Sequence, residues 1–340
     1  MKVFLSSCET GPNAWREKEQ RLRYLHSISA PKMHILASAP EDADLIIITN
    51  LRDYNWWSPV FGNSLLKSFP RKCFTIHDGD RPVPVLRGIY TSVCARAITY
   101  GRVKAGTYGL YRAECKNAFI ARYAHSQVDK RYFFSFSGRV SHPIRAALFS
   151  VRFSREDVHV EESVDFNVFE NPDPGLKARR QEGFAEVLAA SKFALCPRGA
   201  SPSSIRLFES MECGVAPVII SDDWMAPDGP DWSSFSIRVK EREVRFLEGI
   251  LGEREGEWAE MGKRAKLAYE SFFSDEQYFN YLIDRLTDIQ RTQRMPEPLA
   301  LFIARCEIRR RRVKAAIRNL LEATLSQHRG RRPLFGRNAS

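Results

Sequence analysis

Long apolar runs are missing from this chain of 340 residues, and near its start only Val3-Phe4-Leu5 forms a short one. A membrane-spanning helix needs about 20 consecutive, mostly apolar residues. A signal peptide needs an apolar core of roughly 7 to 15 residues. We therefore expect a cytoplasmic protein with neither a membrane span nor a secretion signal.

Paired cysteines are also missing, because the seven cysteines are an odd number and no two form a C-x-x-C pair. Zinc sites need clustered ligands, and disulfide frameworks use even numbers of cysteines. We expect reduced thiols in the core of an intracellular protein and no resident metal. The cysteines are Cys8, Cys73, Cys94, Cys115, Cys196, Cys213 and Cys306.

Excess charge is scarce outside the C-terminal tail. The net charge is +11, yet residues 291–340 hold 13 Lys or Arg against three acids, which leaves the remainder almost neutral. A nucleic-acid-binding body would be basic and would carry a recognisable motif, and neither is present. The composition, 44% hydrophobic and 11% aromatic, is that of a globular protein long enough for two domains.

The chain is organised around the stretch from Ser191 to Asp223. An apolar run ends at Pro197, a small polar loop follows, and residues 205–213 show helical spacing that ends at Gly214, a typical C-cap residue. Residues 215–220 form a second apolar run, which Pro217 predicts to begin as a strand at Val218. The pattern is strand, loop, helix, strand, and such units bind ligands beyond the carboxyl ends of their strands.

The loop of this unit suits an anionic ligand. A helix N-terminus presents unpaired N–H groups, and an arginine offers a fork of donors that fits phosphate oxygens. A carboxylate one and a half turns into the helix, at Glu209, could accept hydrogen bonds from a ribose diol. Ion pairing of the arginine, ordinary capping and a solvated Glu209 would produce the same spacing. The candidate ligand-binding residues of the loop are Arg198, Gly199, Ser201, Ser203 and Ser204.

Three blocks of this stretch resemble the C-terminal signature of the exostosin family, glycosyltransferase family 47. They are KFALCPRG at Lys192 to Gly199, the segment from Arg206 to Asp222, and DWSSFS at Asp231 to Ser236. The blocks keep their order and close spacing over roughly 45 residues, whereas the rest of the chain resembles the family only in general pattern. Animal exostosins have a membrane anchor and a lumenal location, so this chain is more similar to a shorter, soluble, bacterial member.

The resemblance implies an α/β protein of GT-B fold, in which two Rossmann-like domains face a cleft and the C-terminal one binds a nucleotide-sugar. We expect an acceptor-side domain at 1–125 and a donor domain at 126–274. Residues 275–340 would form a C-terminal helical extension. Its first helix, 275–293, would cross back to the N-terminal domain.

Two further junctions supply candidate site residues. A strand at 71–76 runs into His77 and Asp78, either of which could take the proton from an acceptor hydroxyl, although the following Asp-Gly pair also favours a plain turn. A second strand ends in FSGR, which is similar to the exostosin segment that opens the donor domain, so Arg139 would reach the diphosphate unless it is a surface residue. Asp222 or its neighbour Asp223 would touch donor-sugar hydroxyls. No metal is expected there, because GT-B enzymes generally use none.

The tail predicts one more helix, roughly 299–326, in which an apolar stripe is surrounded by basic residues. Such a helix suits an anionic membrane surface, and it suits equally a helix packed on the body or a nonspecific polyanion contact. The stripe consists of Val313, Ile317, Leu320, Leu321 and Leu325. The basic residues are Arg309, Arg310, Arg311, Arg312, Lys314 and Arg318.

Together these features predict a glycosyltransferase that moves a sugar from a nucleotide-diphosphate sugar, with UDP favoured, to a glycan or lipid-linked glycan. Inversion is implied by the family, and the nucleotide-sugar would be a co-substrate with no further cofactor. The protein would be cytoplasmic, peripheral on the inner face of the membrane if the tail binds lipid. The alternatives are a GT-B transferase of another family that uses a GDP-sugar, a non-catalytic GT-B subunit, and a polyanion-binding protein that acts through the tail.

Overall fold

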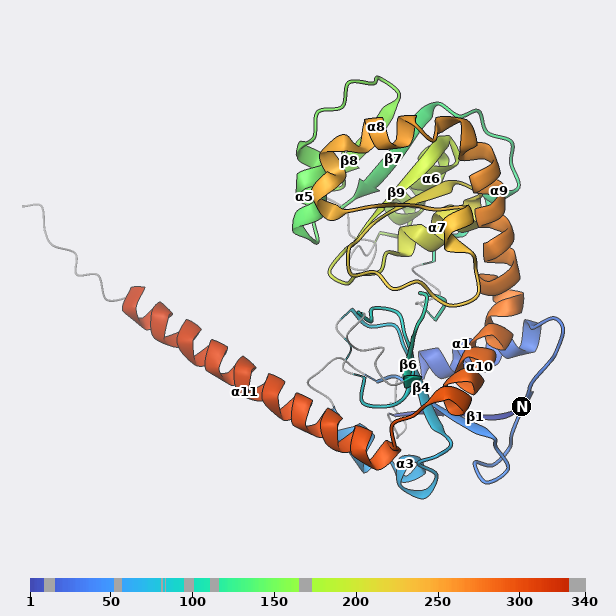
Figure 1. Ribbon diagram of the computed structural model, residues 1–340, viewed down its shortest axis with the longest axis vertical. Coiled ribbons are helices and arrows are strands. Elements are labelled where there is room, and N and C mark those ends of the chain that lie inside the picture. Colours follow the sequence, from blue (N-terminus) through green and yellow to red (C-terminus); the bar gives the residue numbers. More distant parts are fainter. Residues whose placement is uncertain are drawn as a thin grey trace, which may run out of the picture.

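The computed structural model describes residues 1–8, 16–51, 57–80, 82, 84–94, 101–110, 116–164 and 173–329. It contains two parallel sheets, one from each half of the chain, stacked along the long axis of the molecule (Figure 1). Helices cover the sheets, and residues of both halves line a cavity between them. This arrangement is the predicted GT-B fold, with two Rossmann-like domains.

The N-terminal sheet has the strand order β2-β1-β3-β4-β5-β6. Its centre is β3, in which all five residues of the LIIIT run are buried, as expected for a parallel strand covered on both faces. The strands are β1 (Lys2–Ser7), β2 (Ile35–Leu36), β3 (Leu45–Thr49), β4 (Cys73–His77), β5 (Gly88–Tyr90) and β6 (Val103–Ala105). The strand β6, with the sequence VKA, lies within the glycine-rich segment from Gly101 to Gly109.

The C-terminal sheet has the order β11-β10-β9-β7-β8. The chain leaves β7 toward β8 on one side and returns to β9 on the other. The order therefore reverses between β7 and β9, which is the point where such sheets bind ligands. The strands are β7 (Tyr132–Gly138), β8 (Val158–Glu162), β9 (Ser191–Pro197), β10 (Ala216–Ile220) and β11 (Ile237–Val239).

The predicted start of β10 at Val218 is wrong, because the strand begins at Ala216 and includes Pro217. Pro217 pairs with Ala194 of β9, whereas the ladder to β11 begins only at Val218. At Pro217 the strand therefore has a neighbour on one side only. A proline, which has no N–H to donate to a second neighbour, is tolerated there as it is on an edge strand.

Helix α4 (Ala118–Ala124) ends just before the predicted boundary between the domains at residue 125. α4 packs on the C-terminal half, where Ile120 contributes to a cluster with Leu188 of α6 and Val215. The other helices are α1 (Glu17–Ile28), α2 (Trp57–Gly62), α3 (Ser64–Ser68), α5 (Pro143–Ser150), α6 (Pro174–Ala189), α7 (Ile205–Cys213), α8 (Leu247–Gly252), α9 (Trp258–Ala268), α10 (Asp275–Thr292) and α11 (Glu297–Arg329).

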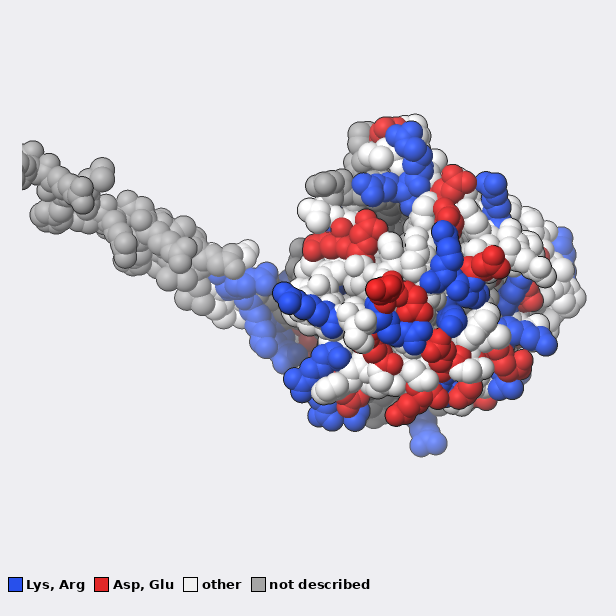
Figure 2. Space-filling model, turned by 90° about the horizontal axis from the view of Figure 1, so that it is seen from above, with Lys and Arg blue, Asp and Glu red and all other residues white. Residues whose placement is uncertain are grey.

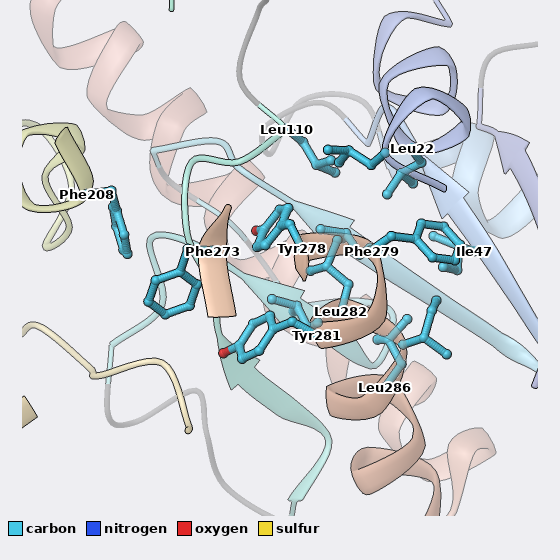
Figure 3. Close-up of a cluster of buried hydrophobic side chains, with 14 of the residues drawn as sticks. Leu22, Ile47, Leu110, Phe208, Phe273, Tyr278, Phe279, Tyr281, Leu282 and Leu286 are labelled. Atoms are coloured by element: carbon cyan, nitrogen blue, oxygen red, sulfur yellow. The ribbon is translucent and has the colours of Figure 1, made fainter. Parts of the chain in front are cut away.

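Helix α10 crosses back from the C-terminal half to the N-terminal half, as predicted (Figure 1). Its apolar face enters the largest buried cluster, between Leu22 of α1 and Ile47 of β3 (Figure 3). The same cluster continues into the C-terminal half through Phe208 and Phe273. Arg21 of α1 also pairs with Asp275 at 2.6 Å, at the first turn of α10. The two domains therefore share one continuous core.

Helix α11 confirms the predicted tail helix and projects from the N-terminal half (Figure 1). Its beginning is fixed by Glu297, whose carboxylate lies 3.2 Å from Arg102 and 3.7 Å from Arg87. None of the helices in the described part of the chain is both long and apolar enough to pass through a bilayer.

Candidate functional site

A cavity of about 1040 Å³ lies in the cleft, at the carboxyl ends of β7 and β9. Its C-terminal wall consists of the residues after β7, the loop before α7, the first turns of α7 and part of α6. Its N-terminal wall includes Asp78, Asp80 and Tyr108. The cavity thus lies at the switch point of the C-terminal sheet, and both domains contribute to it.

The N-terminus of α7 opens into this cavity. Gly199 and Ser201 line it together with Ser203 and Ser204, whose side chains are only 3% and 6% exposed. The hydroxyls of Ser203 and Ser204 have no hydrogen-bond partner among the described residues, and Ser204, the N-cap residue, makes no side-chain cap bond. Buried hydroxyls without partners are costly, and here they stand beside the partial positive charge of a helix N-terminus. This combination suits a bound anion.

Arg206, in the first turn of α7, is held against the end of β7. Its Nε donates to the Ser137 carbonyl at 2.9 Å, and its guanidinium stacks on the rings of Phe136 and Phe184 at 5.6 and 5.4 Å. No hydrogen bond from its two Nη groups is found within the described residues. Gly138 makes room for it, since a Cβ there would lie 3.1 Å from Nη2 of Arg206.

Arg145 of α5 also lines the cavity, and it holds the ends of β7 and β9 together. Its guanidinium donates to the carbonyls of Arg198 at 2.9 Å, Pro197 at 3.1 Å and Arg139 at 3.2 Å. Burial, and then the charge of Arg206, lower the pKa of Arg145 to about 9. It therefore remains a cation at neutral pH, and its donors are already occupied by carbonyls.

Three exposed arginines complete the positive lining of the cavity: Arg139, Arg179 and Arg180. Arg139 follows β7 directly, as the sequence predicts. Arg179 and Arg180 come from α6 on the adjacent wall. Exposed guanidinium groups at a cleft attract anions from solution and raise their rate of encounter.

Glu209 lies one turn beyond Arg206 on α7 and also lines the cavity. Burial raises the pKa of its carboxyl to about 7. The charge of Arg206 acts in the opposite direction, and that of Glu212 adds to the effect of burial. A carboxyl group poised near neutral pH in a cleft is typical of a functional position. Glu209 therefore lies on the cavity wall, and its role toward a ribose stays a prediction.

Of the two predicted candidates for the catalytic base, only one faces the cavity from the N-terminal wall. Asp78 lines the cavity and forms an ion pair with Lys18. His77 is 2% exposed and stacks on Tyr90. Its Nδ1 accepts from the Gly79 amide at 3.1 Å. Burial, then the charge of Lys18, lower the pKa of His77 to about 4, so the imidazole is neutral and lies behind the wall.

Arg198 and Asp222 lie outside the cavity lining. The Nη1 atom of Arg198 lies 3.2 Å from Asp223 and 3.6 Å from Glu241, so its guanidinium turns away from the α7 N-terminus. Asp222 exchanges hydrogen bonds with Glu241, accepting from its amide at 3.1 Å and donating its own amide at 3.2 Å. Arg198 and Asp222 therefore lie in a charged cluster at the end of β10, apart from the candidate residues that line the cavity.

Among the residues of the site that sequence reasoning missed are Arg206, Arg145 and Tyr108. The Tyr108 hydroxyl lies 2.9 Å from Oγ of Ser201, so it joins the two walls. Arg206 begins the family-like segment from Arg206 to Asp222 and lies three residues before Glu209. Residues at this spacing share one face of a helix, so Arg206 could have been predicted from the position of Glu209. Arg145 and Tyr108 lie in ordinary helical and loop sequence, which offered no comparable signal.

Residues 118–253 match the exostosin GT47 domain. This stretch contains α4, the whole C-terminal sheet and the loop before α7, so it covers the C-terminal wall of the cavity. Asp78 and Tyr108, on the opposite wall, lie outside it.

Several named proteins are similar to part of the chain. A probable glucuronosyltransferase of Oryza sativa subsp. japonica is 41% identical over 22% of this chain and 18% of its own length. The exostosin-1 homolog of Caenorhabditis elegans is 40% identical over 20% of this chain and 18% of its own. A probable β-1,4-xylosyltransferase of Arabidopsis thaliana is 34% identical over 25% and 21%. The matched region thus spans about one fifth of these relatives.

Solved structures are similar at low identity. The crystal structure of an α1,3-fucosyltransferase has a TM-score of 0.38 and 15% identity, and the match covers 86% of this chain and 90% of the other. HepE of Anabaena, crystallised in complex with UDP, has a TM-score of 0.35 and 12% identity, with coverage of 86% and 98%.

Proposed function

Because the chain belongs to the exostosin family through residues 118–253, we propose that it is a glycosyltransferase that uses a nucleotide-diphosphate sugar as donor. UDP is the nucleotide that the family resemblance favours, and the acceptor is a glycan or lipid-linked glycan. The observation that carries the proposal is the anion-binding arrangement at the α7 N-terminus. There the buried hydroxyls of Ser203 and Ser204 and the Nη groups of Arg206, which have no hydrogen-bond partner among the described residues, line a cavity between two Rossmann-like domains.

The diphosphate would lie against the first turn of α7. Arg206 presents its Nη groups, Ser203 and Ser204 present hydroxyls, and Arg139 closes over the ligand from the end of β7. As the bond from the sugar to the diphosphate breaks, the leaving oxygen gains charge, and donors already fixed in place stabilise that charge without reorganising. The cationic wall therefore serves both binding and leaving-group departure.

Glu209 would receive the ribose. Its carboxylate accepts hydrogen bonds from vicinal hydroxyls, and it lies one helical turn from Arg206, on the inner side of the cavity. Its elevated pKa reflects burial without a full set of partners. A ribose diol supplies two donors and so favours the ionised form.

Asp78 is the proposed base. The acceptor hydroxyl oxygen attacks the anomeric carbon, its proton passes to the Asp78 carboxylate, and the electron pair of the breaking C–O bond leaves with the diphosphate. Attack from the face opposite the leaving group inverts the anomeric centre. His77 acts as a positioning residue, because its bond to the Gly79 amide fixes the turn that carries Asp78.

No divalent cation is required in this proposal, because arginines supply the positive charge opposite the diphosphate. To test this, the dissociation constant of the donor is measured in EDTA and in excess Mg²⁺. The two values should agree within about twofold. A donor affinity that depends on Mg²⁺ would contradict this part of the proposal while leaving the donor site itself in place.

The donor site is tested by thermal-shift titration with UDP, GDP and their sugars. We expect saturable stabilisation by one nucleotide, about 2.7 kcal/mol at 100 times the dissociation constant. It should be lost in Arg206→Ala and retained in the matched control Arg198→Ala, whose side chain lies outside the cavity. Loss in Arg198→Ala alone would overturn the Arg206 assignment. No stabilisation by any nucleotide would favour a non-catalytic subunit or a polyanion-binding protein.

The reaction is tested with Asp78→Asn. This variant should bind the nucleotide as wild type does but release no UDP from a UDP-sugar in the presence of an acceptor glycan, because no carboxylate remains to take the proton. Asp42→Asn, at an exposed position of the N-terminal half outside the cavity lining, is the control and should keep transfer. Full activity of Asp78→Asn would exclude Asp78 as the base.

A further inference from the structure

One face of α11 is packed on the body for its first three turns. Ala300, Ala304 and Ile308 are 2%, 6% and 5% exposed and join the core cluster beneath β3. Arg305, on the flank, stacks over the Phe61 ring at 4.6 Å. Because these contacts fix the helix at its origin, the orientation of its remaining faces is also fixed.

The opposite face of α11 is apolar and exposed. Leu299, Phe302, Ile303, Val313 and Ile317 are 50%, 63%, 47%, 57% and 52% exposed. At 3.6 residues per turn these positions fall on one side of the helix, roughly half a turn from the buried face. The stripe therefore points away from the body over at least five turns, with one interruption at Arg310. An apolar stripe of this length on a soluble surface marks an interaction site.

The charges beside this stripe indicate its occupant. Glu307 is the only acid between residues 299 and 319, and it pairs with Arg310 at 2.9 Å. Two copies of α11 packed through this stripe would bring like charges together, which disfavours self-association. An anionic surface has the complementary charge. The basic residues of this segment are Arg305, Arg309, Arg310, Arg311, Arg312, Lys314 and Arg318.

We propose that α11 binds the surface of an anionic lipid bilayer, with its apolar stripe inserted among the acyl chains and its basic residues at the headgroups. The helix would lie in the plane of the interface. The body of the protein, seen from above in Figure 2, shows basic and acidic side chains interspersed, whereas basic side chains gather where α11 leaves it. The proposed contact is made by the tail and does not depend on the activity proposed above.

The proposal is tested by co-sedimentation of the full chain with vesicles of equal parts phosphatidylglycerol and phosphatidylcholine, and with pure phosphatidylcholine. The stripe variant is Phe302→Ser with Val313→Ser and Ile317→Ser. The charge variant is Arg309→Gln with Arg310→Gln and Arg312→Gln. Matched controls away from α11 are the exposed Val164→Ser, Val140→Ser and Leu267→Ser, and the exposed arginines in Arg122→Gln, Arg242→Gln and Arg264→Gln.

We expect partitioning onto the anionic vesicles only. The charge variant should reduce it on the order of 100-fold, roughly fivefold for each charge removed. The stripe variant should abolish it at a salt concentration that screens the charges, and the control sets should change it less than twofold. Absence of binding to anionic vesicles would overturn the proposal, as would a stripe variant that binds like wild type, which would indicate a plain polyanion contact. A dimer that depends on Val313 and Ile317, seen by light scattering, would assign the stripe to a second copy instead.

Discussion

The hydroxyl groups of Tyr108 and Ser201 lie 2.9 Å apart and join the two domains at the loop that leads into α7. Ser201 in turn donates to the Ser203 carbonyl at 3.3 Å. The N-terminal domain thereby holds the loop whose serines face the cavity. The geometry of the proposed diphosphate site therefore depends on a residue of the opposite domain.

Replacing Tyr108 by Phe should weaken nucleotide binding. The loop before α7 would lose its contact with the other domain, and we expect about a fivefold lower affinity, the equivalent of about 1 kcal/mol for one hydrogen bond. Isothermal titration calorimetry with the nucleotide measures this affinity. Tyr24→Phe, at an exposed position on α1, is the control and should bind like wild type. An unchanged affinity in Tyr108→Phe would show that the loop keeps its shape unaided.

Arg198→Ala should lower stability while leaving the nucleotide site intact. The guanidinium separates Asp223 from Glu241, and its removal leaves two carboxylates near each other without a cation. We expect a loss of about 1 kcal/mol in urea unfolding. In the double variant Arg198→Ala with Asp223→Asn, much of that loss should be recovered. A variant as stable as wild type would show that the cluster contributes nothing.

Glu209→Gln should change stability and binding in opposite directions. Because the folded pKa of about 7 lies above the ordinary 4.5, the folded protein binds a proton more tightly than the unfolded chain does. Stability should therefore fall as pH rises from about 4.5 to 7. The variant removes this loss and should be more stable than wild type at pH 8, by up to about 3 kcal/mol.

The same variant should bind the nucleotide more weakly, since an amide is a poorer acceptor for a ribose diol than a carboxylate. Urea unfolding at acidic and alkaline pH, combined with titration calorimetry, measures both effects. A variant that is less stable at pH 8 than wild type would contradict the assigned pKa. A variant of unchanged affinity would remove Glu209 from the donor site.

Two glycines of the cavity lining form a matched pair. Gly138→Ala places a Cβ 3.1 Å from both Arg206 Nη2 and Phe136 Cζ, so the guanidinium must shift, whereas Gly183→Ala on α6 meets no atom within 4 Å. We expect Gly138→Ala to lower nucleotide affinity about tenfold. Gly183→Ala should keep it and gain about 0.5 to 1 kcal/mol of helix stability. Equal affinities in the two variants would show that Arg206 is not held in place by Gly138.

Truncation of the tail should have two different effects, depending on where it is made. A chain ending at Arg309 keeps Ala300, Ala304 and Ile308 and should unfold at the wild-type urea concentration. A chain ending at Pro298 exposes the cluster that they cover. It should lose at least about 2 kcal/mol, the burial of Ile308 alone. Equal stability of the two truncations would show that α11 adds nothing to the core.

Much of the fold could be predicted from local sequence, because the informative features lie within short stretches. Three features could be predicted from a few neighbouring residues each. They are the LIIIT run of β3, the apolar face of α10, and Gly214 at the end of α7, which has a φ of 71°. The predicted domain boundaries remain a prediction. So do the assigned roles of the site residues.

The positions of side chains in the site depended on distant partners that no local pattern shows. The position of Arg198 after β9 predicts a phosphate contact, but acids near β10 and after β11 draw its guanidinium away. Arg206 faces the cavity because Ser137 and Phe136, from β7, hold it there. Tyr108 meets Ser201 only through tertiary folding. Predicting these pairs requires knowing which strands are neighbours.

The return of α10 to the N-terminal half also constrains the order of events during synthesis. Phe279, Leu282 and Leu286 fill the centre of the N-terminal core beside Leu22 and Ile47 (Figure 3). While the first half emerges from the ribosome, these side chains have not yet been made. The first domain therefore cannot complete its interior until nearly the whole second domain has emerged, and it depends on its neighbour's timely folding to escape aggregation.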